Sequence, residues 1–392
     1  MTKITDIPAI RFKGFSDTWE QRKLSEIATM HARIGWQNLR TSEFLDSGDY
    51  MLITGTDFID GAVNFDTCHY VERERYEQDK HIQIRNGSIL ITKDGTLGKV
   101  AYIQGLTMPA TLNAGVFNVE IKDENEVDNR YLFQYLKAPF LMDYVDKKAT
   151  GGTIKHLNQN ILVDFPVVLP HKAEQEKIGE YFLAIDHLIT LHQRKYDKLT
   201  NVKKSMLEKM FPQNGSNAPE IRFKGFTEAW EQRKLGDVVD VRSGKDYKHL
   251  SEGNIPVYGT GGFMLSVNQA LSYDEDAIGI GRKGTIDKPY ILKAPFWTVD
   301  TLFYAIPREK VDLNFAFDVF QNIDWKKKDE STGVPSLSKT AINEIDVLVP
   351  QYDEQQPLGQ FFNRIDNLIT LHQRELEKLK NLKKACLEKM FV

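Results

Sequence analysis

Basic, polar and aromatic side chains gather in short glycine-containing segments of this chain, a combination suited to contacts with nucleic acid. Residues 31–37 have the sequence HARIGWQ, and residues 242–249 have the sequence RSGKDYKH. Two glycine turns carry further cations, KDGT at 93–96 and RKGT at 282–285. Arginine and lysine bind guanine edges or phosphates, glutamine binds adenine, and glycine lets the backbone approach a ligand closely.

We therefore expect DNA contacts from residues in both halves of the chain. The set comprises Arg33, Trp36, Gln37, Lys93, Lys99, Lys155, His156, Lys245, Tyr247, Lys248, Arg282, Lys283, Lys288, Ser336 and Lys339. For any one of them the competing interpretation is a solvated surface loop, because loops carry polar residues whether or not they bind a ligand. Taken as clusters, they favour the DNA interpretation.

Sequence motifs of common enzyme classes are missing. Residues 95–100 (GTLGKV) and 259–264 (GTGGFM) lack the GxxxxGK[ST] pattern of a phosphate loop. There is no GxSxG elbow, and the nine histidines show no HExxH or other metal-ligand spacing. KAPF at 137–140 and 293–296 superficially resembles the NPPY-type motif of amino-methyltransferases but lacks its polar first residue and second proline. We expect a binding role, with no catalytic residue and no metal ligand.

Composition places the chain among globular proteins with more than one domain. Its 392 residues suggest two or more cores, and no apolar run approaches the roughly 20 residues of a membrane span. The two cysteines, Cys68 and Cys386, cannot build a disulfide framework or a four-ligand zinc site, so a reduced, cytoplasmic setting is expected. The net charge of −4 argues mildly against nucleic acid, although a basic face can coexist with an acidic remainder.

The elements that must position the candidate residues occur twice. Ile10–Leu24 and Ile221–Leu235 are identical at 12 of 15 positions, and Glu174–Phe211 and Glu354–Phe391 at 23 of 38. Between these repeats lie two segments that hardly resemble each other, Ser25–Pro170 with 146 residues and Gly236–Pro350 with 115. A constant frame around divergent inserts predicts one assembly surface used twice, with two different recognition surfaces.

The second repeat predicts a long helix with the apolar spacing of a coiled coil. Apolar residues recur at alternating intervals of four and three in Glu174–Met210, and at 1.5 Å per residue the helix would span about 55 Å. Such a helix needs a partner, and the obvious partner is its own copy. Lys203 and Lys383 interrupt the pattern; they either extend to the edge of the seam or fix its register. The expected contact residues are Ile178, Phe182, Ile185, Ile189, Leu199, Leu358, Phe362, Ile365, Ile369 and Leu379.

The sequence pattern of the inserts is typical of mixed α/β domains. Short β-branched and aromatic runs alternate with glycines, which predicts strands and tight turns, and residues 129–144 and 314–324 predict helices. We divide the chain into a first recognition domain (1–170), a central helix and linker (171–219), a second recognition domain (220–350) and a distal helix (351–392). Weak similarities between the inserts, such as KDGT with RKGT, suggest one ancestral fold with diverged loops.

These features resemble the specificity subunit of type I restriction-modification systems. The resemblance rests on the duplicated RFKGF…W…RKL string and on the duplicated helices with IDHLITLHQR and IDNLITLHQR. A G-x-x-x-x-L pattern before the helix, as in Gly152–Leu157, is the third mark. The resemblance covers essentially the whole chain. It implies an α+β protein in which two target-recognition domains, related by pseudo-twofold symmetry, are separated by two long antiparallel coiled-coil helices.

The resemblance also implies a function for each part. Each recognition domain would bind one half of a split sequence in double-stranded DNA, and the helices would set the spacer between the halves. Two modification subunits would bring S-adenosylmethionine and methylate adenine, and restriction subunits would add cleavage driven by ATP with Mg. The chain itself would bind no cofactor and touch no membrane. Because the inserts differ, we expect two unlike half-sites.

Three alternatives stay open at this stage. An orphan specificity subunit would act with modification subunits only. A coiled-coil scaffold would hold protein partners without binding DNA. A free-standing methyltransferase or nuclease would need cofactor or metal motifs that the sequence lacks.

Overall fold

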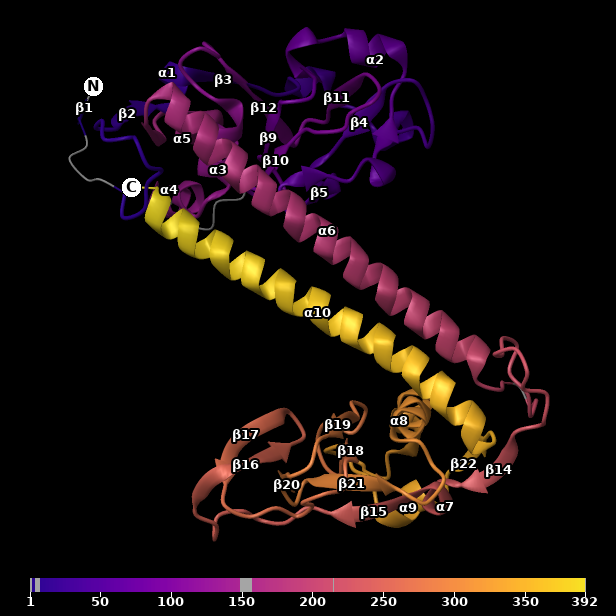
Figure 1. Cartoon of the computed structure of the whole chain (residues 1–392). Coiled ribbons are helices and arrows are strands. Elements are labelled where there is room, and N and C mark those ends of the chain that lie inside the picture. Colours follow the sequence, from indigo (N-terminus) through magenta and orange to yellow (C-terminus); the bar gives the residue numbers. More distant parts are fainter. Residues whose placement is uncertain (1, 4–7, 149–156, 214, 392) are drawn as a thin grey trace. The chain divides into compact units, whose positions relative to one another are not determined.

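The computed structural model describes residues 2–3, 8–148, 157–213 and 215–391 (Figure 1). The chain divides into two compact units: unit 1 contains residues 1–191 and 376–392, and unit 2 contains residues 192–375. Each unit thus combines one insert with part of each long helix, whereas the sequence predicted the helices as segments of their own, 171–219 and 351–392. The reason is that these helix parts bury their apolar faces against the inserts.

Unit 1 is built on two four-stranded sheets, with strand orders β10-β9-β12-β3 and β7-β4-β11-β8. β11 pairs with β4 in parallel and with β8 antiparallel, and every residue of β9 and β4 is buried. Branched and aliphatic side chains form these strands because they fit a pleated, covered surface. The bounds are β3 (Ala28–His31), β4 (Met51–Ile53), β7 (His69–Tyr70), β8 (Gln83–Ile84), β9 (Ile89–Thr92), β10 (Val100–Tyr102), β11 (Ala110–Leu112) and β12 (Val116–Ile121).

Smaller elements complete unit 1. A third sheet has the order β1-β2-β13, and β5 and β6 form a hairpin. The bounds are β1 (Thr2–Lys3), β2 (Glu20–Lys23), β5 (Phe58–Ile59), β6 (Ala62–Val63), β13 (Pro166–Leu169), α1 (Leu24–Ile27), α2 (Arg73–Glu77) and α5 (Gln159–Val163).

The single helix expected over residues 129–144 is wrong: the structure has two helices there. α3 spans Asn129–Lys137 and α4 spans Phe140–Lys148. The break falls at Pro139, because proline has no N–H to donate and the residue before it avoids the helical conformation. At the other end, the carboxylate of Asp128 accepts from the backbone N–H groups of residues 130 and 131 and caps α3.

Unit 2 repeats this plan with different strands. Its sheets have the orders β15-β21-β18-β19, β17-β16-β20 and β14-β22. The helix expected at 314–324 is α8, Leu313–Asn322, capped by Asp312. The other bounds are β14 (Glu231–Lys234), α7 (Leu235–Val238), β15 (Val239–Ser243), β16 (Glu252–Gly259), β17 (Gly262–Val267), β18 (Ala277–Gly281), β19 (Tyr290–Leu292), β20 (Trp297–Thr298), β21 (Leu302–Pro307), α9 (Lys339–Asn343) and β22 (Asp346–Val349). The expected α+β class, with mixed helix and sheet in both halves, is confirmed.

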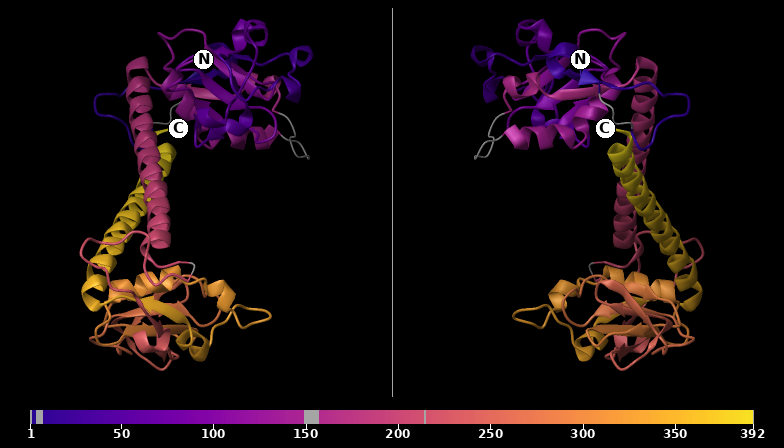
Figure 2. Two further views of the ribbon diagram at one scale, coloured as in Figure 1. Left: turned by 90° about the vertical axis from the view of Figure 1, so that its right-hand side faces the viewer. Right: turned by 90° about the vertical axis from the view of Figure 1, so that its left-hand side faces the viewer.

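The two long helices are α6, Lys172–Met210, and α10, Tyr352–Met390, each 39 residues and continuous (Figure 2). Inside unit 1, the Tyr181 hydroxyl of α6 lies 3.6 Å from Cys386 Sγ of α10. Inside unit 2, His192 Nδ1 lies 3.0 Å from His372 Nδ1. In unit 1 Asp186 further pairs with Lys383, and in unit 2 Lys203 pairs with Asp366, so residue numbers rise along one helix as they fall along the other and the parts run antiparallel. No described helix is long and apolar enough to cross a membrane.

Ile178, Phe182, Ile185 and Ile189 pack in the core of unit 1, and Leu358 and Phe362 pack in the core of unit 2. Ile178, Phe182, Ile185, Leu358, Phe362 and Ile365 are buried, and Ile189, Leu199, Ile369 and Leu379 are partly buried. Of the two interpretations of Lys203 and Lys383, the structure contradicts extension to the edge of the seam, because Lys383 is buried and Lys203 is partly buried. Lys383 pairs with Asp186 of its unit, and Lys203 with Asp366 of its unit, because a buried ammonium needs a counter-charge.

The repeated residues form a joint between each insert and the long helices. In unit 1 the guanidinium of Arg11 donates to both oxygens of the buried Glu174 carboxylate, at 2.7 and 2.8 Å. In unit 2 Arg222 binds Glu354 in the same two-pronged way, at 2.6 and 2.7 Å. Charge-assisted bidentate bonds fix orientation as well as distance. The frame is therefore repeated in the sequence because the same joint is built twice.

Candidate nucleic-acid interface

In unit 2 the glycine turn at 281–285 is pinned to the segment that precedes α9. The backbone N–H of Arg282 donates to Thr301 O at 2.8 Å, and the N–H of Leu337 donates to Arg282 O at 2.9 Å. A Cβ at Gly281 would lie 1.9 Å from Thr285 O, so only glycine permits so tight a turn. Lys283 forms an isolated bridge with Ser336. The structure thus brings together three residues that were proposed from sequence alone.

The cations of this turn face solvent. Arg282 and Lys283 are exposed, and the Arg282 guanidinium lies 5.7 Å from the centre of the Phe303 ring. Lys288 and Lys339 are exposed as well, and Ser336 is partly buried. Exposed cations on a turn of fixed backbone can bind phosphate or a base edge at little further cost in conformational entropy.

A second loop of unit 2 supports the remaining candidates. The N–H of Lys245 donates to Thr298 O at 2.9 Å, and Trp297 Nε1 donates to Lys245 O at 2.9 Å. Lys245 and Lys248 are exposed, whereas Tyr247 packs against the cluster around Trp297. Tyr247 therefore holds the loop, and the two lysines are free to reach a ligand.

Unit 1 has the counterpart of the first arrangement. The N–H of Leu157 donates to Lys93 O at 2.8 Å, as Leu337 does to Arg282 in unit 2. The Lys93 ammonium lies 5.4 Å from the centre of the Phe117 ring and is partly buried, whereas Lys99 is exposed. Lys155 and His156 lie outside the described residues.

Two candidates of unit 1 are buried. Arg33 is 2% exposed, and its guanidinium donates to Leu112 O at 3.0 Å and to side chains of Gln78 and Thr111. Burial lowers the pKa of Arg33. Gln37 is also buried, and Trp36 is described only as backbone. Arg33 and Gln37 thus hold the fold and have no surface to offer DNA, so we drop both from the proposed contacts.

The structure adds two groups that the sequence analysis missed. Lys326, Lys327 and Lys328 are exposed, and an ion pair of 3.1 Å between Lys326 and Asp287 brings them beside the loop of Lys288. The run of three lysines was the available signal. Phe263 and Met264, at the end of the β16–β17 hairpin, are 63% and 49% exposed. Nothing in the sequence distinguishes them from core residues of a strand.

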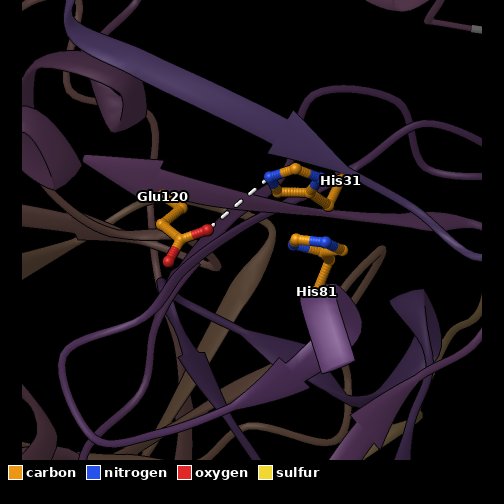
Figure 3. A group of neighbouring side chains, drawn as sticks. All are labelled: His31, His81 and Glu120. Atoms are coloured by element: carbon orange, nitrogen blue, oxygen red, sulfur yellow. Dashed lines mark ion pairs between the residues drawn. The ribbon is translucent and has the colours of Figure 1, made fainter. Parts of the chain in front are cut away.

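His31, His81 and Glu120 form a cluster on unit 1, with ligand atoms within 4.8 Å of one another (Figure 3). The two imidazole rings are stacked, with centroids 4.6 Å apart and planes 20° apart. A metal must lie in the plane of each imidazole that binds it, and nearly parallel stacked planes do not converge on one ion. Glu120 Oε2 lies 3.6 Å from His31 Nε2 in an ion-pair position. We assign no metal to this cluster.

The two cysteines are buried and free. Burial raises the pKa of the Cys68 thiol to about 12, which keeps it protonated and unreactive at neutral pH.

Comparisons with known proteins identify the family of this chain. The sequence matches the family described as "Type I restriction modification DNA specificity domain" over residues 16–201 and 227–381. The Type I restriction enzyme MjaVIII specificity subunit of Methanocaldococcus jannaschii is 25% identical over 349 residues, which cover 78% of this chain and 78% of that protein. The putative type I restriction enzyme MjaX specificity subunit of the same organism is 24% identical over 415 residues, covering 98% and 93%.

A solved structure shares the fold. The crystal structure of the Type-I restriction-modification system S subunit from M. genitalium superposes with a TM-score of 0.75 at 17% sequence identity. The superposition covers 99% of this chain and 99% of that chain.

Proposed function

The chain belongs to the family of type I restriction-modification DNA specificity domains. We propose that it determines which DNA sequence a type I restriction-modification complex recognises. Specificity subunits of these systems are non-catalytic, and methylation and cleavage reside in other subunits. We propose that this chain binds a bipartite, asymmetric target, with one half-site for each unit.

One observation carries the proposal: the same loop arrangement is built twice with different side chains. In both units a leucine N–H donates to the first residue of a glycine turn, Leu157 to Lys93 and Leu337 to Arg282. The turn of unit 1 continues with an aspartate, and that of unit 2 with Lys283. Side chains of different charge at equivalent places select different bases, which supports two unlike half-sites.

The long helices support two further roles in the proposal. Their fixed length of 39 residues would set the number of unread base pairs between the half-sites. They also expose leucines at equivalent positions: Leu188 and Leu191 on α6 are 42% and 38% exposed, and Leu368 and Leu371 on α10 are 45% and 51% exposed. Exposed apolar pairs on a helix mark a protein contact. We propose that each pair binds one modification subunit.

The partner subunits would carry out methylation and cleavage. Modification subunits would bind S-adenosylmethionine and methylate an adenine extruded from the duplex. Restriction subunits, where present, would use ATP and Mg to translocate and cleave DNA. This chain would contribute double-stranded DNA binding and would need no cofactor of its own.

The test is single-molecule methylome sequencing of a host that expresses this chain with its cognate modification subunit, beside a host without the chain. The proposal predicts an N6-methyladenine motif with two unlike halves and a fixed spacer, present only with the chain. A palindromic motif would contradict the asymmetry. An assembled complex that leaves no motif would favour the scaffold, and a motif without restriction activity would identify the orphan form.

A further inference from the structure

The hairpin of β16 and β17 ends in exposed apolar side chains. Tyr258 pairs with Phe263, and Gly259 with Gly262, whose φ of 105° only glycine adopts readily. Phe263 and Met264 follow the turn at 63% and 49% exposure. Val257 pairs with Leu265 and Tyr258 with Phe263, so Met264 is the extra residue of a β-bulge, and both exposed side chains lie at the hairpin end. The hairpin therefore projects into solvent with an apolar tip.

The tip is held in a defined position. β20 pairs with β16 in parallel, with Thr298 opposite Tyr258, and the N–H of Val299 donates to Tyr258 O at 3.0 Å. The hydroxyl of Tyr290 donates to Gly259 O at 2.6 Å, directly at the turn. A side chain on a supported turn loses little conformational entropy when it binds. An exposed aromatic residue on such a support is suited to bind a ligand rather than to collapse onto the protein.

Two cations of the candidate interface belong to segments that are hydrogen-bonded to residues in or just after β20, the strand beside this hairpin. Phe263, Tyr258 and Thr298 lie on adjacent strands, so Phe263 and Thr298 are about 10 Å apart at a strand spacing of about 4.8 Å. The Lys245 backbone is bonded to Thr298, and the Arg282 backbone to Thr301. Both side chains are exposed. An apolar tip flanked by cations complements DNA, which presents phosphates around stacked apolar bases.

On the basis of the proposed function, we propose that Phe263 and Met264 form a wedge that inserts between base pairs in the second half-site. Insertion would unstack one base step and kink the duplex, at a cost that depends on the sequence of that step. The wedge would therefore contribute specificity at positions where no side chain binds a base edge. Pyrimidine–purine steps, which unstack most easily, are the expected target.

The test uses the complex of this chain with its cognate modification subunit and duplexes with 2-aminopurine at successive positions of the second half-site. The methylated adenine is left unlabelled, because its extrusion also raises fluorescence. Wild type should raise the fluorescence at one further step. Phe263→Ala/Met264→Ala should abolish that rise and weaken binding about tenfold or more. Because no cation is removed, the slope of log affinity against log salt should stay unchanged.

Two controls separate the wedge from its surroundings. Arg282→Gln/Lys283→Gln removes charge and should reduce the salt slope by about one for each phosphate that is no longer neutralised. Tyr352→Ala removes an exposed aromatic at the first residue of α10 and should leave both fluorescence and affinity unchanged. Phe263→Trp/Met264→Leu keeps the apolar tip and should retain the fluorescence rise.

The outcomes distinguish this inference from the proposed function. If the wild-type complex binds its target but Phe263→Ala/Met264→Ala keeps the fluorescence rise and affinity, the wedge is wrong and the addressing role stands. If that variant fails to assemble with the modification subunit, the hairpin is a protein contact and the wedge is again wrong. If the wild-type complex shows no sequence-specific binding, the proposed function fails first.

Discussion

In both units a lysine–aspartate pair links the two long helices, and side chains of the insert contact it. This second joint between helices and insert has different insert residues in the two units. In unit 1, Lys383 Nζ lies 2.6 Å from Asp186 Oδ1, and Gln134 Nε2 donates to Asp186 Oδ2 at 2.8 Å. A second cation, Lys137, lies 3.5 Å from the same carboxylate. The joint of unit 1 thus holds two ammonium groups and one carboxylate.

The joint of unit 2 has the opposite balance. Lys203 pairs with Asp366 and donates to Gln321 Oε1 at 2.6 Å. A second carboxyl, Asp318, is 1% exposed, and its Oδ2 has no hydrogen-bond partner among the described residues. The positive charge of Lys203 also acts on Asp318, so the joint of unit 2 holds one ammonium group and two carboxyl groups.

The lysine–aspartate pair is the same in both units, whereas the insert residue beside it is a lysine in unit 1 and an aspartate in unit 2. Burial, followed by the charge of Lys137, lowers the pKa of Lys383 to about 8. Burial raises the pKa of Asp318 well above its ordinary value, so that this carboxyl is held towards its neutral form. The insert of unit 1 thus places a cation beside the lysine–aspartate pair, and the insert of unit 2 places a carboxyl group there. In each unit one buried group has its pKa shifted towards its neutral form.

Breaking the pair should harm unit 1 most. Asp186→Ala would leave the buried Lys383 without a counter-charge beside the partly buried Lys137, and the free energy of unfolding should fall by about 3 kcal/mol. Asp366→Ala should cost less, because ionised Asp318 can replace the lost carboxylate beside Lys203. Hydrogen exchange of α3 and α8 in increasing urea would measure the two losses separately.

The exposed Glu377→Ala on α10 is the matched control and should change neither helix. Equal losses in the two units would show that the second carboxyl of unit 2 plays no part.

Alkaline pH should stabilise unit 1. The folded-state pKa of Lys383, about 8, lies below its ordinary 10.5, so between these values the unfolded chain holds a proton that the folded chain has lost. Stability rises with pH wherever the unfolded state binds more protons, here by up to about 3 kcal/mol across that window. Lys383→Met should remove the rise. Urea unfolding of α3 at pH 7, 8, 9 and 10 would measure it, and a flat wild-type profile would contradict the account.

Unit 2 should respond to pH in the opposite direction. The raised pKa of Asp318 means that the folded chain keeps a proton that the unfolded chain loses above the ordinary 3.8. The contribution of this group to stability therefore falls as pH rises above 3.8 towards the folded-state pKa. Asp318→Asn should remove the fall and make α8 more resistant to exchange at neutral pH. A loss of protection in this variant would mean that the carboxyl is ionised and paired.

Substitution of the equivalent glycines of the two long helices, Gly179 and Gly359, should have the same effect in both units. A Cβ at Gly179 would lie 2.8 Å from the backbone N of Tyr131, and one at Gly359 would lie 2.6 Å from that of Phe315. α6 packs at Gly179 against the first turn of α3, and α10 packs at Gly359 against the first turn of α8. Alanine at either position should cost about 1–3 kcal/mol of unfolding free energy. Gly333→Ala, which meets open space, is the control, and thermal unfolding would measure all three.

The smallest effects should come from single loop cations. Lys99→Gln in unit 1 and Arg282→Gln in unit 2 should each weaken methylation by about 1 kcal/mol, because each variant removes one exposed cation from the interface. The unit 1 variant should relax the motif only in the first half-site, and the unit 2 variant only in the second. Methylome sequencing would measure both, and relaxation of the wrong half would contradict the assignment of units to half-sites.

Local patterns predicted the frame well. The alternating spacing of Ile178, Phe182 and Ile185 predicted α6 to within two residues at its start, because a buried helical face shows its period in the sequence. The similarity of KDGT to RKGT predicted equivalent turns, which the bonds from Leu157 and Leu337 support.

Contacts between distant segments could not be predicted. Arg33 resembles a surface arginine, but strand residues some 80 positions away supply its acceptors and bury it. The joints have the same character: neither Gln134 nor Asp318 carries a local signal of its partner on a long helix. Exposure of Phe263 depends on where β20 and the turn place the hairpin, which no local pattern records.

If one repeated frame supports two inserts that recognise different half-sites, exchanging an insert should change the half-site that is recognised. Residues 236–350 would be replaced by a second copy of residues 25–170, which brings Gln134 and Lys137 to the conserved pair Lys203 and Asp366. With the cognate modification subunit, methylome sequencing should then give a palindromic motif, made of the first half-site and its inverted copy around a spacer. An unchanged asymmetric motif would show that the inserts do not determine the half-sites, and the account would fail.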